Sequence, residues 1–398
     1  MKEVQSGITA AQGFLTGAVH CGIRNNPTKK ELALIYSSTP CSAAAVYTSN
    51  QVKAAPLYLN MKQLANGKAQ AISINSGNAN ACAINDEKNA LKQAQVAAQK
   101  LGLDVEDVLV ASTGVIGVEL PIEKVEKGTQ EIVLGTDSSD TAAAIMTTDT
   151  KIKEVAVEFE LEGKTIHMGG IAKGSGMIHP NMGTMLCFIT TDASIESSIL
   201  QAMLKEAVKK TFNRISVDGD TSTNDMCIVL ANGLAKNPTI TQDNDTFYQA
   251  LVYVMQKLAI EIASDGEGAS RLITVTMEGA KSEEQAETLA MSVASSSLLK
   301  AAVFGQDANW GRVLCAMGYA KATFDPNKVD IYFASKNGKI LVCQDGKGIA
   351  FDEEEAAKIL APDAIEILAD LHEGNERATC WGCDLTYDYV RINGDYRT

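Results

Sequence analysis

A glycine-rich segment between positions 169 and 193 combines residue types that can carry out covalent chemistry. It begins Gly-Gly-Ile-Ala-Lys-Gly-Ser-Gly-Met, is interrupted by Pro180, and runs into the apolar residues 185–189. Glycines let backbone N–H groups approach a ligand, proline stops a helix, and an apolar run predicts a buried strand. Thr184 is therefore expected at the junction between a crowded turn and a rigid strand.

Thr184 has the side chain of a nucleophile, but a hydroxyl is weak until a base takes its proton. A chain-terminal α-amine has a pKa near 7.7–8.0, so cleavage before Thr184 would put nucleophile and base on one residue. Thr184 Oγ would attack the carbonyl of Gly183, and glycine permits the strained backbone that this attack needs. Without further motifs, Thr184 reads more simply as the first residue of a core strand.

The segment resembles the self-cleavage site of the ornithine acetyltransferase (ArgJ) family, the glutamate N-acetyltransferases of arginine biosynthesis. The matching residues are Lys-Gly-Ser-Gly-Met-Ile at 173–178 and Pro-Asn-Met-Gly-Thr-Met-Leu at 180–186. Gly183 departs from the alanine that is usual in the family, and both residues are small. The resemblance implies an α-chain of residues 1–183 and a β-chain of residues 184–398, with Thr184 as the new terminal nucleophile.

The resemblance extends from Gly13 to Thr398 and implies an oxyanion hole in the sequence Ser-Thr-Gly at 112–114. A Thr-Gly step at the end of a strand can aim a hydroxyl and a backbone N–H into one small volume. Acyl transfer needs such donors, because its tetrahedral intermediate carries an oxyanion. By resemblance, Thr113 and Gly114 are this pair. Without the resemblance they indicate only a turn.

The resemblance also implies a substrate-binding set drawn from both chains. Lys173 suits a substrate carboxylate, and Glu267, between two glycines, suits an ammonium group. From the residues alone, Thr147 and its neighbour Thr148 equally suit a helix cap, and Glu267 suits a solvated helix end. The implied set is Thr147, Lys173, Thr184, Glu267, Asn393 and Thr398.

The activity that the resemblance implies is transfer of acetyl from N2-acetylornithine to glutamate through an acetyl-enzyme on Thr184. Acetyl-CoA is a second candidate donor, which would make the enzyme bifunctional as an amino-acid N-acetyltransferase. No cofactor and no metal are expected, because a placed nucleophile and an oxyanion hole lower the barrier themselves. Family members assemble as pairs of cleaved protomers, so an α2β2 heterotetramer is expected.

Two alternatives to this activity stay open. One is an N-terminal-nucleophile amidohydrolase or aminopeptidase, which passes the acyl group to water. The other is a relative that neither cleaves itself nor catalyses a reaction.

The composition limits the classes of binding partner and the cellular location that are expected. The formal net charge of −14 argues against nucleic-acid and membrane partners, which require a cationic face. Nine scattered cysteines suit reduced thiols, and Cys380 and Cys383 form a lone CxxC without a second pair, so zinc and redox roles are disfavoured. No apolar run approaches the ~18 residues of a membrane span, and a cytoplasmic protein is expected.

Strand and helix patterns alternate along the chain around these residues. Apolar runs at 32–36, 43–47 and 69–74 predict three strands, and an asparagine-rich loop is expected from Asn75. Helices are predicted at 86–101, 195–212, 247–263 and 284–302, and a hairpin at 155–170. This interleaving predicts an α/β fold of layered mixed sheets flanked by helices. The resemblance implies that the fold is of the N-terminal-nucleophile type.

Overall fold

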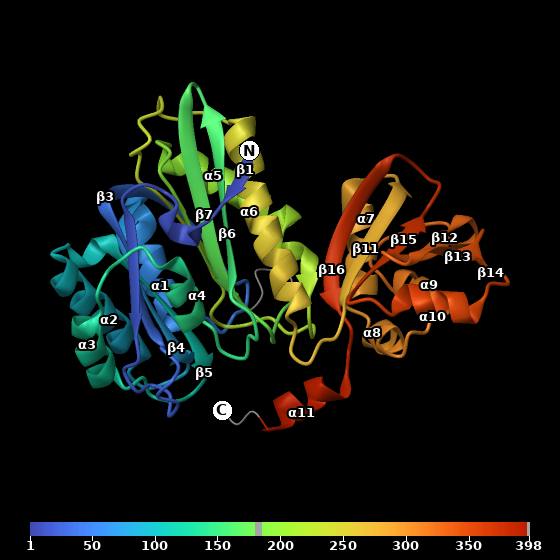
Figure 1. Ribbon diagram of the computed structural model, residues 1–398, viewed down its shortest axis with the longest axis horizontal. Coiled ribbons are helices and arrows are strands. Elements are labelled where there is room, and N and C mark those ends of the chain that lie inside the picture. The colour runs from blue at the N-terminus through green and yellow to red at the C-terminus, as the bar shows by residue number, and fades with distance from the viewer. Residues whose placement is uncertain (180–184, 396–398) are drawn as a thin grey trace.

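The computed structural model describes residues 1–179 and 185–395, which form two lobes side by side (Figure 1). Within these residues the N-terminal lobe holds a nine-stranded sheet in the order β1-β6-β7-β8-β10-β3-β4-β5, with β2 paired to β3. Its elements are β1 (Lys2–Val4), β2 (Phe14–Val19), β3 (Leu32–Tyr47), α1 (Ala55–Gln63), β4 (Lys68–Asn78), α2 (Asp86–Leu101), β5 (Val108–Val115), α3 (Ile122–Glu131), α4 (Ser138–Ala144), β6 (Lys153–Leu161), β7 (Lys164–Lys173), β8 (Leu186–Thr191), α5 (Ser197–Lys210), β10 (Met226–Ala231) and α6 (Asp245–Ser264).

The C-terminal lobe is built on a seven-stranded sheet, counted over the same residues, in the order β14-β13-β12-β15-β11-β16-β9. Its elements are β9 (Ile215–Ser216), β11 (Leu272–Ala280), α7 (Glu283–Ala294), α8 (Ser297–Phe304), α9 (Trp310–Gly318), β12 (Asp330–Ser335), β13 (Gly338–Gln344), β14 (Lys347–Gly348), α10 (Glu353–Leu360), β15 (Ala364–Asp370), β16 (Glu376–Cys383) and α11 (Tyr387–Asp395). Parallel and antiparallel neighbours occur in both sheets. The predicted layered α/β fold with mixed sheets is therefore confirmed.

The centre of the N-terminal sheet is buried on both faces, which explains the continuous apolar runs of β8 and β10. Alternate residues of β10 enter two cores: Cys227 and Val229 pack with α5 and α6, whereas Ile228 and Leu230 pack on the opposite face. Side chains of a strand alternate between faces, so a strand covered on both sides must be apolar throughout. The glycine-rich segment thus leads into a strand, β8, that is buried along its whole length.

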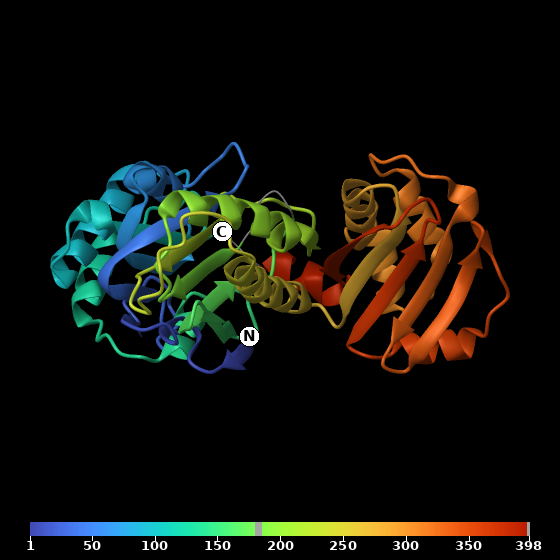
Figure 2. The same cartoon turned by 90° about the horizontal axis from the view of Figure 1, so that it is seen from above.

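The lobes are joined through several elements, including α6, which shares a hydrophobic cluster with Trp381 and Cys383 of β16. β9, which precedes β10 in the chain, pairs with β16 of the C-terminal sheet. The last helix, α11, leaves the C-terminal sheet and runs back towards the N-terminal lobe (Figure 1). Seen from above, α6 ends at the side of the N-terminal lobe that faces its neighbour (Figure 2). Of the helices in the described ranges, none combines the length and apolar character that crossing a membrane requires.

Three predicted elements differ from the structure. The runs at 32–36 and 43–47 belong to one strand, β3, whose pairing with β4 shifts register between Tyr36 and Cys41 around Pro40. A bulge accommodates a proline because it leaves one residue unpaired. The helix predicted at 284–302 is two helices, because Ser296 accepts a hydrogen bond from the Leu299 N–H and caps α8.

The asparagine-rich loop was predicted to start too early, because Asn75–Asn78 still belong to β4. Their buried amides find partners in neighbouring segments: Ser112 Oγ donates to Asn75 Oδ1 at 2.6 Å, and Asn78 Nδ2 donates to the Val118 carbonyl at 3.0 Å. Buried polar groups are tolerated in a sheet when they are paired in this way. The asparagines therefore fix the end of β4 beside β5.

Candidate active site

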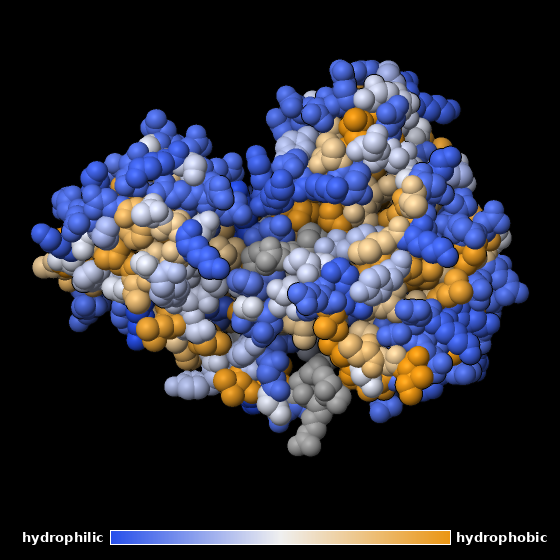
Figure 3. All heavy atoms as spheres, turned by 180° about the vertical axis from the view of Figure 1, so that it is seen from behind, coloured by the Kyte–Doolittle hydropathy of each residue, from blue (hydrophilic) through white to orange (hydrophobic). Residues whose placement is uncertain are grey.

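A pocket of about 150 Å³ lies between the N-terminal lobe, the segment after α6, and α11. It is lined by Thr113, Gly114, Ile116, Thr147, Thr148, Lys173, Gly176, Met177, Glu267 and Asn393. Six of these were predicted as site residues, although they are spread over 281 positions of the sequence, from 113 to 393. The predicted residues Gly183, Thr184 and Thr398 lie outside the described residues. Seen from behind, the surface is indented where the two lobes meet (Figure 3).

Thr113 and Gly114 lie near the end of β5, where the strand passes close to β4. Gly114 has φ +135°, and a Cβ on it would lie 2.3 Å from the carbonyl carbon of Gly77. A side chain at this position would therefore collide with the backbone of the neighbouring strand. The glycine requirement comes from this close approach and not from a turn.

Lys173, the last residue of β7, is buried and donates a long hydrogen bond of 3.4 Å from Nζ to Thr113 Oγ1. Within the described ranges this is its one hydrogen-bond partner, although an ammonium group has three N–H donors. Burial lowers the pKa of Lys173, while the nearby carboxylate of Asp149 opposes that change. Because Thr113 Oγ1 accepts from Lys173, its own hydrogen is available for another acceptor.

The backbone of Thr147 is hydrogen-bonded to Asp149, and Thr147 does not cap a helix. The Thr147 N–H donates to Asp149 Oδ2 at 2.9 Å, and the Gly174 N–H donates to Asp149 Oδ1 at 2.6 Å. No helix begins at this part of the described chain, since α4 ends at Ala144 and β6 follows. Burial alone would raise the pKa of Asp149, but Lys173 and Lys153 hold it well below its usual value.

Glu267 is fixed from two directions. Its N–H donates to the Ser175 carbonyl at 2.9 Å, and its Oε2 accepts from Asn393 Nδ2 at 2.8 Å. A Cβ on Gly176 would lie 2.3 Å from Oε2 of Glu267. Glu267 is thus a pocket residue, and the alternative of a plain solvated helix end does not describe it.

Two aspartates of one segment hold the described residues on either side of positions 180–184. Asp218 accepts the Met177 and Ile178 N–H groups at 2.5 and 2.8 Å. Asp225 accepts the Met185 N–H at 2.8 Å, and burial raises the pKa of this carboxyl well above its usual range. These contacts anchor both flanks of the predicted cleavage point.

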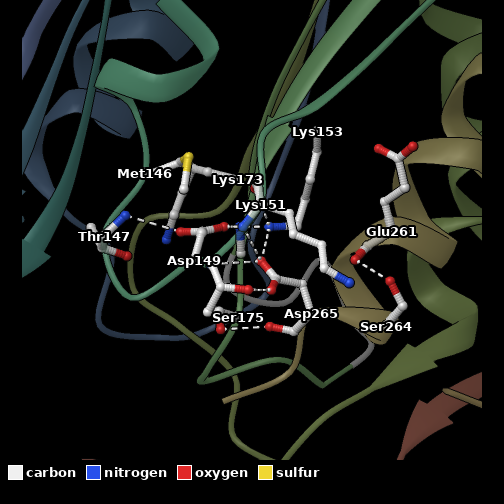
Figure 4. Close-up of polar contacts among 12 residues, drawn as sticks. Met146, Thr147, Asp149, Lys151, Lys153, Lys173, Ser175, Glu261, Ser264 and Asp265 are labelled. Carbon is white, nitrogen blue, oxygen red and sulfur yellow. Dashed lines mark hydrogen bonds and ion pairs between the residues drawn. The ribbon is translucent and has the colours of Figure 1, made fainter. Parts of the chain in front are cut away.

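Sequence reasoning missed a buried ion-pair cluster behind the pocket (Figure 4). Lys153 Nζ contacts Asp149 Oδ1 at 2.8 Å and Asp265 Oδ2 at 2.6 Å. Asp265 also accepts the Thr150 N–H at 3.0 Å. The sequence gives little sign of this, because Lys153 stands at the start of a hairpin strand, where an exposed lysine is common.

The cysteine pair takes no part in the pocket. Cys380 and Cys383 are buried free thiols in β16. In the parts of the chain that the structure covers, no three His, Cys, Asp or Glu side chains are grouped so that they could hold a metal ion.

Comparison with known proteins identifies the family. A model of the ArgJ family matches residues 15–398. A protein of Caldanaerobacter subterraneus subsp. tengcongensis named arginine biosynthesis bifunctional protein ArgJ is 52% identical over 408 residues, covering 100% of each chain. A protein of the same name from Thermotoga neapolitana is 50% identical and covers 97% of this chain and 99% of its own. The crystal structure of such a protein from Bacillus halodurans is 44% identical and covers 52% of this chain and 97% of its own, with a TM-score of 0.49. From the family match over nearly its whole length, the chain belongs to the ArgJ family.

Proposed function

We propose that this ArgJ-family enzyme cleaves itself between Gly183 and Thr184 and then moves acetyl from N2-acetylornithine to glutamate through Thr184. The products of cleavage are an α-chain of residues 1–183 and a β-chain of residues 184–398. The names of its relatives, which call them bifunctional proteins of arginine biosynthesis, support this assignment.

One observation carries the proposal: residues far apart in the sequence meet around one pocket. Thr113 and Lys173 precede the proposed cut, whereas Glu267 and Asn393 follow it, and all four line the same 150 Å³. The cavities of about 340 and 730 Å³ elsewhere in the described structure contain none of the predicted residues. Convergent polar groups of both charges in a small pocket suit a zwitterionic amino acid.

The proposed reaction has two transfers. Thr184 Oγ, deprotonated by its own α-amine, attacks the acetyl carbonyl of N2-acetylornithine, and Thr113 and Gly114 donate to the oxyanion. The C–N bond breaks, and ornithine leaves with the proton on its nitrogen. The amine of glutamate then attacks the ester, and Thr184 recovers its hydroxyl proton. Lys173 faces the substrate carboxylate, and Glu267 faces an ammonium group.

The proposal includes acetyl-CoA as a second donor, an α2β2 assembly of cleaved protomers and a cytoplasmic location. Acetyl-CoA with glutamate as the sole substrates tests the first of these. Light scattering of the purified protein tests the assembly.

Cleavage and transfer are tested on the same preparations. Mass spectrometry of the purified protein should give two chains that divide between Gly183 and Thr184, and Thr184→Ala should give one intact chain without activity. With N2-acetylornithine and glutamate, the product should be N-acetylglutamate. Release of free acetate at the same rate without glutamate would instead indicate the hydrolase, and an intact, inactive chain would indicate the non-catalytic relative.

A further inference from the structure

The cluster behind the pocket is a buried lysine between two buried carboxylates. The side chains of Lys153, Asp149 and Asp265 are 1%, 0% and 3% exposed. Burying charges is costly, so a cluster of this kind is expected only where its partners compensate one another closely. Figure 4 shows the Lys153 ammonium in contact with both aspartates.

The carboxylate of Asp149 and the backbone of Asp265 each hold a part of the pocket wall. Asp149 accepts the N–H groups of Thr147, which lines the pocket, and of Gly174, which directly follows β7. The Asp265 carbonyl accepts a hydrogen bond from Ser175 Oγ at 2.7 Å, directly before the pocket residue Gly176. Through its two ion pairs, Lys153 therefore joins two backbone segments that carry pocket-lining residues.

A second buried lysine stands beside the same aspartate without pairing with it. Lys173 interacts electrostatically with Asp149, yet no ion pair joins it to a carboxylate in the described part of the molecule. Asp149 already accepts from Lys153, Thr147 and Gly174, which leaves it little capacity for another donor. Among the described residues, Lys173 Nζ has only the 3.4 Å hydrogen bond to Thr113 Oγ1, and its other N–H donors have no partner there.

We propose that Lys153 is a positioning residue, which occupies Asp149 and so leaves the Lys173 ammonium free to bind a substrate carboxylate. The proposal rests on the function proposed above, in which Lys173 faces that carboxylate. Lys153 itself does not line the pocket. Its action on the substrate is through Asp149 and Lys173.

The charged groups that face Lys173 agree with this arrangement. Asp149 and Asp225 favour its charged form, whereas Lys153 and Arg24 disfavour it. Without Lys153, the Asp149 carboxylate would lose its ion-pair partner. Opposite charges in a poorly hydrated site attract strongly, so Lys173 would be the next cation to pair with it. Lys173 would then turn to Asp149 and withdraw from the substrate.

The test compares Lys153→Met with the double variant Lys153→Met, Asp149→Asn. We expect the single variant to raise KM for glutamate and N2-acetylornithine about tenfold with kcat within about twofold, because ground-state binding is lost. The double variant removes the anion that captures Lys173, but it also removes one of the two oxygens that accept the Thr147 and Gly174 N–H groups, so KM should fall about threefold below that of the single variant without reaching the wild-type value. Constants are expressed per cleaved chain as measured by mass spectrometry, and Lys209→Met, an exposed ion-pair lysine, is the matched control.

Two results would overturn the proposal: an unchanged KM in Lys153→Met, or a double variant with a KM as high as the single one. If Lys153→Met does not fold, Lys153→Met with Asp265→Asn restores the balance of buried charge and carries the same expectations. A crystal structure of the single variant should place Lys173 Nζ about 3 Å from the Asp149 carboxylate. This readout needs no activity, so it separates failure of the positioning proposal from failure of the proposed acetyl transfer.

Discussion

Asn393 in α11 donates a hydrogen bond of 2.8 Å from Nδ2 to Oε2 of Glu267, 126 residues earlier in the chain. Asn393 also donates to the Tyr389 carbonyl at 3.1 Å, so its amide is fixed within its own helix. The last ordered helix of the described chain therefore sets the orientation of a pocket carboxylate. Both residues line the same cavity.

Asn393→Ala should release Glu267 and weaken binding of the amine-bearing substrate. We expect KM to rise about fivefold with little change in kcat, because a hydrogen bond to a charged group is lost at a partly exposed site. Asn337→Ala is the control, since Asn337 makes an equally short amide contact to the Lys358 carbonyl away from the pocket. Equal kinetic constants in the two variants would contradict the role of Asn393.

Gly176→Ala should displace the carboxylate of Glu267. The new Cβ would lie 2.3 Å from Oε2, a distance that real carbon atoms do not adopt, so Glu267 must move. We expect at least a tenfold lower kcat/KM in steady-state assays, since small displacements of positioning groups have large effects. Gly318→Ala, where a Cβ meets nothing within 4 Å, should leave kcat/KM unchanged.

Activity should fall on the alkaline side at a pH below the ordinary lysine range. Burial lowers the pKa of Lys173, and kcat/KM declines as its ammonium loses a proton. Asp149→Asn removes the largest opposing influence, so the alkaline limb should move to still lower pH. The measurement is the pH profile of kcat/KM for N2-acetylornithine. A limb that stays in place in Asp149→Asn would remove Lys173 as its origin.

Glu261 should destabilise the protein at alkaline pH. Burial raises its pKa to about 7, with Lys153 and Lys257 opposing, and its Oε2 has no partner in the described structure. A carboxyl whose pKa is raised in the folded state contributes stability at low pH that is lost as the pH rises through about 7.

Glu261→Gln should therefore raise the apparent Tm at pH 8 and leave it nearly unchanged at pH 5. After allowance for partial solvent screening, the gain at pH 8 is about 1 kcal/mol, or roughly 2–4 °C. Scanning calorimetry at both pH values measures it, with the exposed Glu206→Gln as control. A gain that is the same at pH 5 would show that charge is not its cause.

The sequence was sufficient for the elements whose periodicity is strong. The helix predicted at 86–101 is α2, since its alanines recur on one face, and the hairpin at 155–170 is β6 and β7 with slightly longer strands. The predicted bounds of helices and strands were wrong where a local side-chain hydrogen bond mattered more than the hydrophobic pattern. Ser296 interrupts an otherwise uniform helical run, and paired asparagines extend β4 where polar residues suggest a loop.

In the candidate site, the residues that belong to a recognisable sequence motif could be predicted from the sequence. The buried residues that hold them in place could not. Thr113, Lys173 and Glu267 stand in glycine-flanked sequences that match a family, and the structure brings all three to one pocket. Lys153 and Asp265 carry no local signal, because their partners are up to 112 residues away. Only the tertiary fold distinguishes a buried ionic cluster from ordinary surface charges.

The order of strands across the N-terminal sheet determines what a break between β7 and β8 would do. β7 pairs with β8, and β10 pairs with β8 on one side and with β3 on the other. Strands from before and after positions 183 and 184 thus alternate within one hydrogen-bonded layer. The two fragments could separate only if the hydrogen bonds between β7 and β8 and those between β10 and β3 were both broken. A cleaved molecule would therefore remain one particle.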